Sequence, residues 1–153
     1  MNLMVPPGVY YRTGSSLGEA EREIAVVLIV AKWGAAFPIS EHEWIAEGTS
    51  GYSKAGIPAE IVQRMIVGLP VSFQDPRQQL VYEVATALIQ SRYVPKVLYD
   101  RAVKVLGNNG ITDLAIIMGY FIMVAFTLMF RDVPSFAEGL KREPFIQAKG
   151  VIG

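Results

Sequence analysis

Eight consecutive residues, 40–47, concentrate the side chains of this chain that could carry out acid/base chemistry. They include its only histidine, one of its two tryptophans and three carboxylates: His42, Trp44, Glu41, Glu43 and Glu47. On a helix, Glu43 and Glu47 are four residues apart and share a face, and His42 is offset from Glu43 by about 100 degrees. Two carboxylates at this spacing repel each other, so in a partly buried pocket one should have a raised pKa and hold a proton near neutral pH.

A protonated carboxyl group beside an imidazole meets the needs of general acid/base catalysis. We expect Glu47 and His42 to form the acid/base pair and Glu43 to orient them. Such a site needs one proton donor and a few polarising donors, and no metal. The candidates for substrate binding are two tryptophans, a tyrosine and an arginine: Trp44, Tyr120, Trp33 and Arg22.

Each of these residues also has a purely structural interpretation. Glu43 stands three residues after Ser40, the spacing of a capping box, and Glu41 suits the first turn of a helix as a solvated acid. His42 could be a surface or interface histidine, and the aromatic candidates could belong to the core or to an interface. Arg22 could pair with neighbouring acids, whereas Glu47 has no Lys or Arg nearby before Lys54, which favours a pocket position.

The composition excludes several classes of function. The absence of cysteine rules out disulfides, thiol chemistry and thiolate metal sites, and a single histidine leaves at most a weak carboxylate metal site. Basic and acidic residues balance at 14 each without a basic cluster, so we expect no nucleic-acid partner. The first residues lack the features of a signal peptide, which predicts a cytoplasmic protein.

The hydrophobic periodicity predicts one all-α domain over residues 1–153, without strands. The signals that bound its helices are capping boxes at Ser16 and Ser40, the Asp75-Pro76 pair, and glycines at the helix ends. They predict six helices, over residues 16–33, 41–55, 59–67, 76–92, 95–107 and 112–130, with a turn at 108–110. We expect residues 1–15 to form an irregular arm, because prolines and glycines interrupt them, and residues 135–153 to form a tail.

The segment 114–130 contains no charged residue and is the best candidate for a membrane helix. It is shorter than the roughly 20 apolar residues that a spanning helix requires, and its flanks carry no positive bias. The other predicted helices are amphipathic or capped as in soluble proteins. We therefore expect a central helix buried on all faces in a large or oligomeric all-α core, with no membrane partner.

The order of several short motifs resembles the carboxymuconolactone decarboxylase family, a branch of the AhpD-like superfamily. The first half carries Arg22-Glu23, Leu28 to Ala31, Glu43-Trp44, Ala55-Gly56-Ile57 and Ala59-Glu60-Ile61. The second half follows with a helix opening near Arg77, a turn at Gly107, Gly119-Tyr120-Phe121, Val124-Ala125 and Thr127-Leu128. The resemblance covers about residues 17–134 and implies an AhpD-like fold of about six helices that assembles as homotrimers or homohexamers.

The resemblance also bears on the chemistry. The peroxidase branch carries Cys-x-x-Cys-x-x-x-His, and those positions fall here on Ser40, Glu43 and Glu47, so a thiol peroxidase is excluded. The decarboxylase branch commonly has Tyr-Glu-Trp-x-x-His in this helix. Glu43 and Trp44 match that pattern, whereas His42 stands in the tyrosine position and Glu47 in the histidine position.

The resulting hypothesis is a cofactor-free carbon–carbon lyase that decarboxylates a small carboxylated or lactone-type organic acid. It predicts that Glu47→Gln abolishes turnover while the homo-oligomer survives. One alternative is a related proton-transfer enzyme on the same fold, such as an isomerase, dehydratase or lactone hydrolase. The other is a non-catalytic oligomeric binding protein, in which the 40–47 face would be ion-paired without a cavity beside it.

Overall fold

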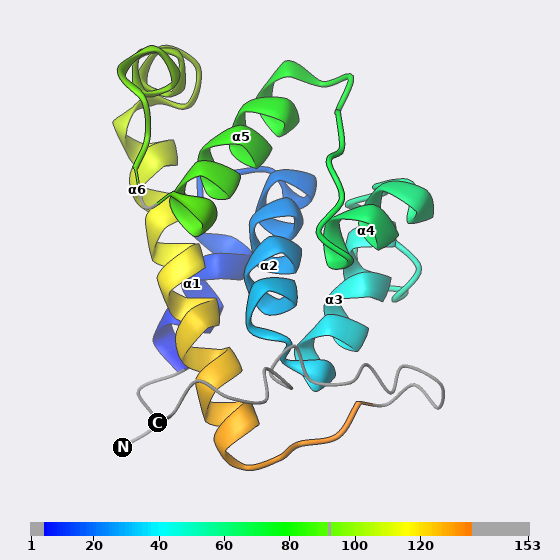
Figure 1. The fold of residues 1–153 in the computed structure, drawn as a ribbon. Helices are drawn as coiled ribbons and strands as arrows, with labels where there is room; N and C mark the ends of the chain where they lie inside the picture. Colours follow the sequence, from blue (N-terminus) through cyan, green and yellow to red (C-terminus); the bar gives the residue numbers. More distant parts are fainter. Residues whose placement is uncertain (1–4, 92, 136–153) are drawn as a thin grey trace, which may run out of the picture.

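The computed structural model describes residues 5–91 and 93–135, which form six α-helices and no strand (Figure 1). The helices are α1 Val5–Thr13, α2 Glu19–Trp33, α3 Ala36–Glu47, α4 Ala59–Ile66, α5 Pro76–Gln90 and α6 Lys96–Phe130. The prediction of an all-α domain with six helices is confirmed. Most of the predicted tail, from residue 136 on, lies outside the described residues.

Helix α2 forms the centre of the fold and packs against α3, α4, α5 and α6 (Figure 1). Its apolar run is buried as predicted, with Ile24, Ala25, Val26 and Val30 each fully inaccessible to solvent. Apolar side chains from α5 and α6 complete this core, among them Leu80, Val81, Leu114 and Ile117. Because α2 is apolar all round, it needs neighbours on every side, and the surrounding helices provide them.

The prediction of an irregular arm at residues 1–15 is wrong for the described part, because residues 5–13 form helix α1. Pro6 and Pro7 fall in its first turn, where the backbone N–H groups have no partner within the helix and proline is tolerated. Tyr11 is buried in the core, and the Tyr10 hydroxyl donates a hydrogen bond of 2.5 Å to Asp113. These contacts attach α1 to α6.

The predicted capping box at Ser16 and Glu19 is also wrong. Gly18, two residues later, is the N-cap of helix α2, and its N–H donates to the Glu21 carboxylate at 3.0 Å. Ser16 instead donates from both its N–H and its hydroxyl to Asp113, each at 2.6 Å. Burial alone would raise the pKa of Asp113, but the hydrogen bonds from Ser16 and Tyr10 outweigh it and lower that pKa.

Helix α3 starts five residues earlier and ends eight residues earlier than predicted. It begins at Ala36 with Pro38 in the first turn, and the Ser40 hydroxyl donates back to the Phe37 carbonyl at 3.0 Å, so Ser40 is not the N-cap. The helix ends at Gly48, which has a φ of 76°. A Cβ atom there would lie 3.2 Å from the backbone nitrogen of Gly56, so both the left-handed backbone and this close approach favour glycine. His42 therefore lies in the middle of α3.

Helix α6 combines the last two predicted helices. Gly107 lies at a kink with φ 69° and ψ 174°, which agrees with the predicted break, but residues 108–110 are helical and do not form a turn. Arg77 of α5 donates to the Val105 carbonyl at 2.9 Å and, in a bidentate pair, to Glu21 of α2 at 2.7 and 3.2 Å. This arginine thus connects three helices next to the kink.

Within this chain, the apolar part of α6 is not buried on all faces, so its burial on all faces in an oligomeric core stays a prediction. Of the 18 consecutive residues of α6 with the highest mean hydropathy, 33% are buried. Phe121 and Ala125 face the core, whereas Ile116, Phe126 and Phe130 are exposed. By length and composition, α6 could cross a membrane, although core helices of soluble proteins meet the same criterion.

Candidate functional site

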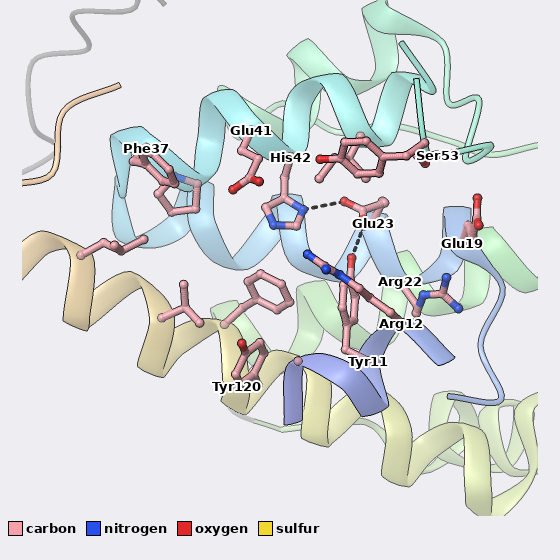
Figure 2. Close-up of a pocket in the computed structure, with 17 residues that line it drawn as sticks. Tyr11, Arg12, Glu19, Arg22, Glu23, Phe37, Glu41, His42, Ser53 and Tyr120 are labelled. Carbon is pink, nitrogen blue, oxygen red and sulfur yellow. Dashed lines mark hydrogen bonds and ion pairs between the residues drawn. The ribbon is translucent and has the colours of Figure 1, made fainter. Parts of the chain in front are cut away.

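A cavity of about 410 Å³ lies between α1, α2, α3 and α6 (Figure 2) and is partly open to solvent. Its volume is within the range of pockets that hold small ligands, about 300–1,000 Å³. The polar lining includes Arg12 of α1, Glu19, Arg22 and Glu23 of α2, Glu41 and His42 of α3, and Tyr52 and Ser53 of the following loop. The aromatic lining includes Tyr11, Phe37, Tyr120 and Phe121.

A chain of two buried hydrogen bonds connects α1, α2 and α3 at this cavity (Figure 2). Nδ1 of His42 lies 2.7 Å from one carboxylate oxygen of Glu23, and the Tyr11 hydroxyl donates to the other. His42 is 6% exposed and Glu23 is 3% exposed. A carboxylate this deeply buried requires hydrogen-bond partners, and Tyr11 and His42 supply one for each oxygen.

The Glu23 carboxylate can only accept hydrogen bonds, so it selects the His42 tautomer that carries its proton on Nδ1. The second ring nitrogen, Nε2, has no hydrogen-bond partner among residues 5–91 and 93–135. The ring of Phe121 packs edge-on against the imidazole at a centroid distance of 4.8 Å and restricts its rotation. Nε2 is therefore the atom of His42 that is available to exchange a proton with a ligand.

Tyr11 acts as a hydrogen-bond donor in this chain. Burial raises the pKa of its hydroxyl, and the negative charge of Glu23 raises it further, while the nearby Arg22 and Arg12 guanidinium groups oppose the shift. The hydroxyl therefore stays protonated at neutral pH and fixes the position of Glu23. The Tyr11 ring also packs edge-on against Phe121 at 5.2 Å, which holds α1 against the same wall of the cavity.

The two arginines of the lining differ in their contacts. Arg22 donates to the Leu17 carbonyl at 2.8 Å, and its guanidinium carbon lies 5.6 Å from the centre of the Tyr11 ring. Arg12 forms no hydrogen bond or ion pair with any residue of the described ranges. Of the acids, Glu19 accepts the backbone N–H of Lys54 at 2.7 Å.

Three of the predicted site residues line the cavity and four do not. His42, Arg22 and Tyr120 line it. The remaining four, Glu43, Glu47, Trp44 and Trp33, lie outside its lining. The helical period explains the result on α3, because Pro38, Glu41, His42 and Ile45 share the face that lines the cavity, and positions 43 and 47 fall on another side.

The excluded residues have other contacts. Glu43 accepts a hydrogen bond from the Gln63 side chain on α4, and burial together with the charge of Glu43 raises the pKa of Glu47. Trp44 is 51% exposed, and Trp33 packs edge-on against Phe126 at 4.7 Å beside a separate apolar groove. The predicted repulsion between Glu43 and Glu47 is thus present, but away from the cavity.

Sequence reasoning missed Glu23 and Tyr11 as partners of the histidine. A signal for Glu23 exists, because this carboxylate directly precedes the buried apolar run that starts at Ile24, and a carboxylate beside such a run needs a buried partner. Tyr11 gave no comparable signal, since α1 has no clear hydrophobic period. Arg12 and Glu41 could be placed at the cavity only after the packing of α1 and the true start of α3 were known.

Within the described residues, no group of three or more His, Asp or Glu side chains comes together in a way that could hold a metal ion. No protein-family model, no curated protein and no solved structure matches this chain.

Proposed function

We propose that this chain is a cofactor-free acid/base enzyme that transfers a proton to or from a small organic acid. The observation that carries the proposal is the Tyr11–Glu23–His42 chain, whose free nitrogen belongs to a residue that lines a ligand-sized cavity. A buried carboxylate that orients a histidine is a costly arrangement for the fold, and it serves proton transfer well. Two guanidinium groups in the same lining suit an anionic substrate.

In this scheme His42 is the catalytic residue and Glu23 is a positioning residue. Nε2 accepts a proton from the substrate carbon, and the imidazolium that forms is compensated by the Glu23 carboxylate. The same nitrogen returns the proton to the substrate in the second half of the reaction. Tyr11 holds Glu23 in place through its hydroxyl and does not change its protonation state.

Decarboxylation is the reaction implied by the resemblance to carboxymuconolactone decarboxylases. The bond between the carboxylate and the neighbouring carbon breaks, its electron pair passes into a lactone or enone, and the Nε2–H of a protonated His42 protonates the carbon after CO2 leaves. Glu47, which the sequence favoured as the acid, lies outside the cavity lining, so His42 takes that role.

A second reaction, isomerisation by proton transfer with the carboxylate retained, is favoured by the arginines. A guanidinium that binds a carboxylate stabilises its negative charge, and that charge must be lost when CO2 forms. A carboxylate held by Arg12 or Arg22 is therefore better suited to stay on the product. Both reactions use the same nitrogen of His42.

One screen tests the proposal and separates the two reactions. The full chain is incubated with a panel of small carboxylic acids, lactones and enones in D2O, and NMR follows deuterium uptake at carbon while released CO2 is measured. Deuterium uptake without CO2 indicates isomerisation, and uptake with CO2 indicates decarboxylation. His42→Gln should abolish the activity, and Glu23→Gln should reduce it about 10²-fold or more.

Glu47→Gln is the matched control, because Glu47 is a carboxylate on the same helix but outside the cavity lining. We expect it to keep the wild-type rate to within a few-fold. Circular dichroism verifies that each variant is folded. Full activity of His42→Gln, or loss of activity in Glu47→Gln alone, would overturn the assignment of roles.

A further inference from the structure

The lining of the cavity changes in character from one end to the other (Figure 2). Arg12, Arg22 and Glu19 lie on one side of the Glu23–His42 pair, and we call this side the cationic end. Phe37 and Glu41 lie on the other side. Val124 and Leu128 also line the cavity and continue along α6 beyond Phe121, toward the helix end that lies near the start of α3 (Figure 1). Phe37, Pro38, Val124 and Leu128 form the apolar end.

We infer that the ligand of this cavity is a monocarboxylate with an apolar tail. Its carboxylate binds Arg12 at the cationic end, and its tail lies in the apolar end, so that the carbons between them pass His42 Nε2. The inference rests on the proposed function for the reaction at His42, but it concerns binding and is tested by binding. It names the class of substrate that the acid/base chemistry would act on.

Arg12 is the guanidinium that is available to a ligand. Arg22 already donates to the Leu17 carbonyl and packs over the Tyr11 ring, whereas Arg12 has no hydrogen-bonding or ion-pairing partner within the described ranges. Its positive charge also opposes the rise in the pKa of the Tyr11 hydroxyl, so it acts on the same hydrogen-bonded chain. A guanidinium in this position can form a bidentate pair with a carboxylate.

The apolar end is suited to hydrocarbon. Pro38 is buried, and Phe37, Val124 and Leu128 are partly buried, with their side chains contributing to the wall of the cavity. Removing a methylene group from water contributes about 0.8 kcal/mol, so affinity should rise about fourfold with each carbon added to the tail until this end is filled. A short acid such as acetate would leave the end empty.

Glu41 restricts the ligand to one carboxylate. It stands four residues after Phe37 on α3, so both side chains lie on one face of the helix, and both line the cavity. Glu41 forms no hydrogen bond or ion pair in the part of the chain that the structure describes. A second carboxylate at the far end of a ligand would meet this negative charge without a cation to offset it. Dicarboxylates should therefore bind more weakly than monocarboxylates of the same length.

The test is isothermal titration of the full chain with four probes that differ in one property each: octanoate, octanamide, suberate and acetate. Octanoate should bind at least about tenfold more tightly than each of the others. Octanamide removes the charge, suberate adds a second carboxylate, and acetate removes the tail. Binding of suberate or acetate as tight as that of octanoate would overturn the inference, and so would the absence of octanoate binding.

Variants assign the two ends of the ligand. Arg12→Gln should weaken the binding of octanoate about tenfold and leave the affinity for octanamide unchanged. The control is Lys104→Gln, which removes an exposed positive charge on α6. Phe37→Ala should weaken octanoate, while Leu88→Ala, in the separate apolar groove, should not. Glu41→Gln should reduce the difference in affinity between octanoate and suberate. If Leu88→Ala alone weakens octanoate, the tail binds elsewhere and the inference fails.

The titration also distinguishes failure of the inference from failure of the proposed function. His42→Gln removes the catalytic nitrogen, so it should abolish turnover while octanoate binding is retained. If octanoate binds with the expected selectivity but no acid or lactone is turned over by the wild type, the cavity is a binding site for apolar acids and the enzyme proposal is wrong. If turnover depends on His42 but prefers dicarboxylates, the enzyme proposal stands and the inference fails.

Discussion

Replacing Glu23 by glutamine keeps the size of the side chain and removes the charge that orients His42. The wild-type carboxylate accepts one hydrogen bond on each oxygen, from the Tyr11 hydroxyl and from His42 Nδ1 at 2.7 Å. A glutamine has a single carbonyl oxygen, so it can accept one of these bonds and must present its NH2 group to the other partner. The variant therefore separates the effect of charge from that of packing.

The magnitude follows from the burial of the pair. A hydrogen bond to a charged group contributes about 1.5–3 kcal/mol, against about 1 kcal/mol for a neutral one, so the preference for the Nδ1–H tautomer should fall about tenfold. The free energy of unfolding should fall by about 1–3 kcal/mol. Part of that loss is offset, because the variant no longer buries a carboxylate that is only 3% exposed.

The assay makes use of the fact that His42 is the only histidine. A ¹⁵N spectrum of the imidazole contains one pair of ring signals, and in the neutral form these report which nitrogen holds the proton. The wild type should show the Nδ1–H tautomer, and Glu23→Gln should show a mixture of both tautomers. Urea unfolding of the same samples measures the change in stability.

The control is Glu60→Gln, the same substitution at an exposed position of α4. It should leave the imidazole spectrum and the stability unchanged. An identical spectrum for the wild type and folded Glu23→Gln would refute the argument, because it would show that the carboxylate does not set the tautomer of His42.

Two further predictions concern stability. The pKa of Asp113 is lowered in the folded protein, so Asp113 contributes to stability above the unfolded pKa of about 3.9, and this contribution is lost as the pH falls through the folded pKa. Asp113→Asn should therefore lower the free energy of unfolding by about 2 kcal/mol at neutral pH. In urea unfolding, the stability of this variant should depend less on pH in the acid range than that of the wild type. Arg77→Ala should cost about 1–3 kcal/mol, because Glu21 is left buried without its partner and the Val105 carbonyl loses a donor. Arg101→Ala, which breaks a more exposed ion pair, should cost at most about 1 kcal/mol, and equal losses in the two arginine variants would contradict this account.

The helical class and several helix limits follow from local signals in the sequence. Asp75 accepts the backbone N–H groups of Arg77 and Gln78 as an N-cap, as the Asp-Pro pair predicts, and Gly34 ends α2 in the left-handed conformation. The buried run of α2 was also predictable, because a helix that is apolar all round must be covered by neighbours. These features depend on residues a few positions apart, so the sequence alone is sufficient.

The predictions failed where distant residues compete for the same polar group. Ser16 has the spacing of a helix cap, but the buried Asp113, 97 positions away, takes its hydrogen bonds, and Gly18 becomes the cap in its place. On α3, Pro38, Glu41, His42 and Ile45 lie on the face that packs over the cavity, and Glu43 and Glu47 fall on another side of the helix. Local spacing cannot report competition from another helix.

The candidate site was decided mainly by tertiary structure. Of the residues that the sequence offered as site candidates, His42, Arg22 and Tyr120 line one cavity, and their predicted roles stay predictions. The partners of the histidine, Glu23 and Tyr11, come from two other helices, and only their packing around Phe121 brings the three side chains together. Sequence thus determines which groups can exchange protons, and the helix packing determines which of them meet. The physical reason is range, because a hydrogen bond joins atoms about 3 Å apart, whereas Tyr11 and His42 are 31 positions apart in the chain.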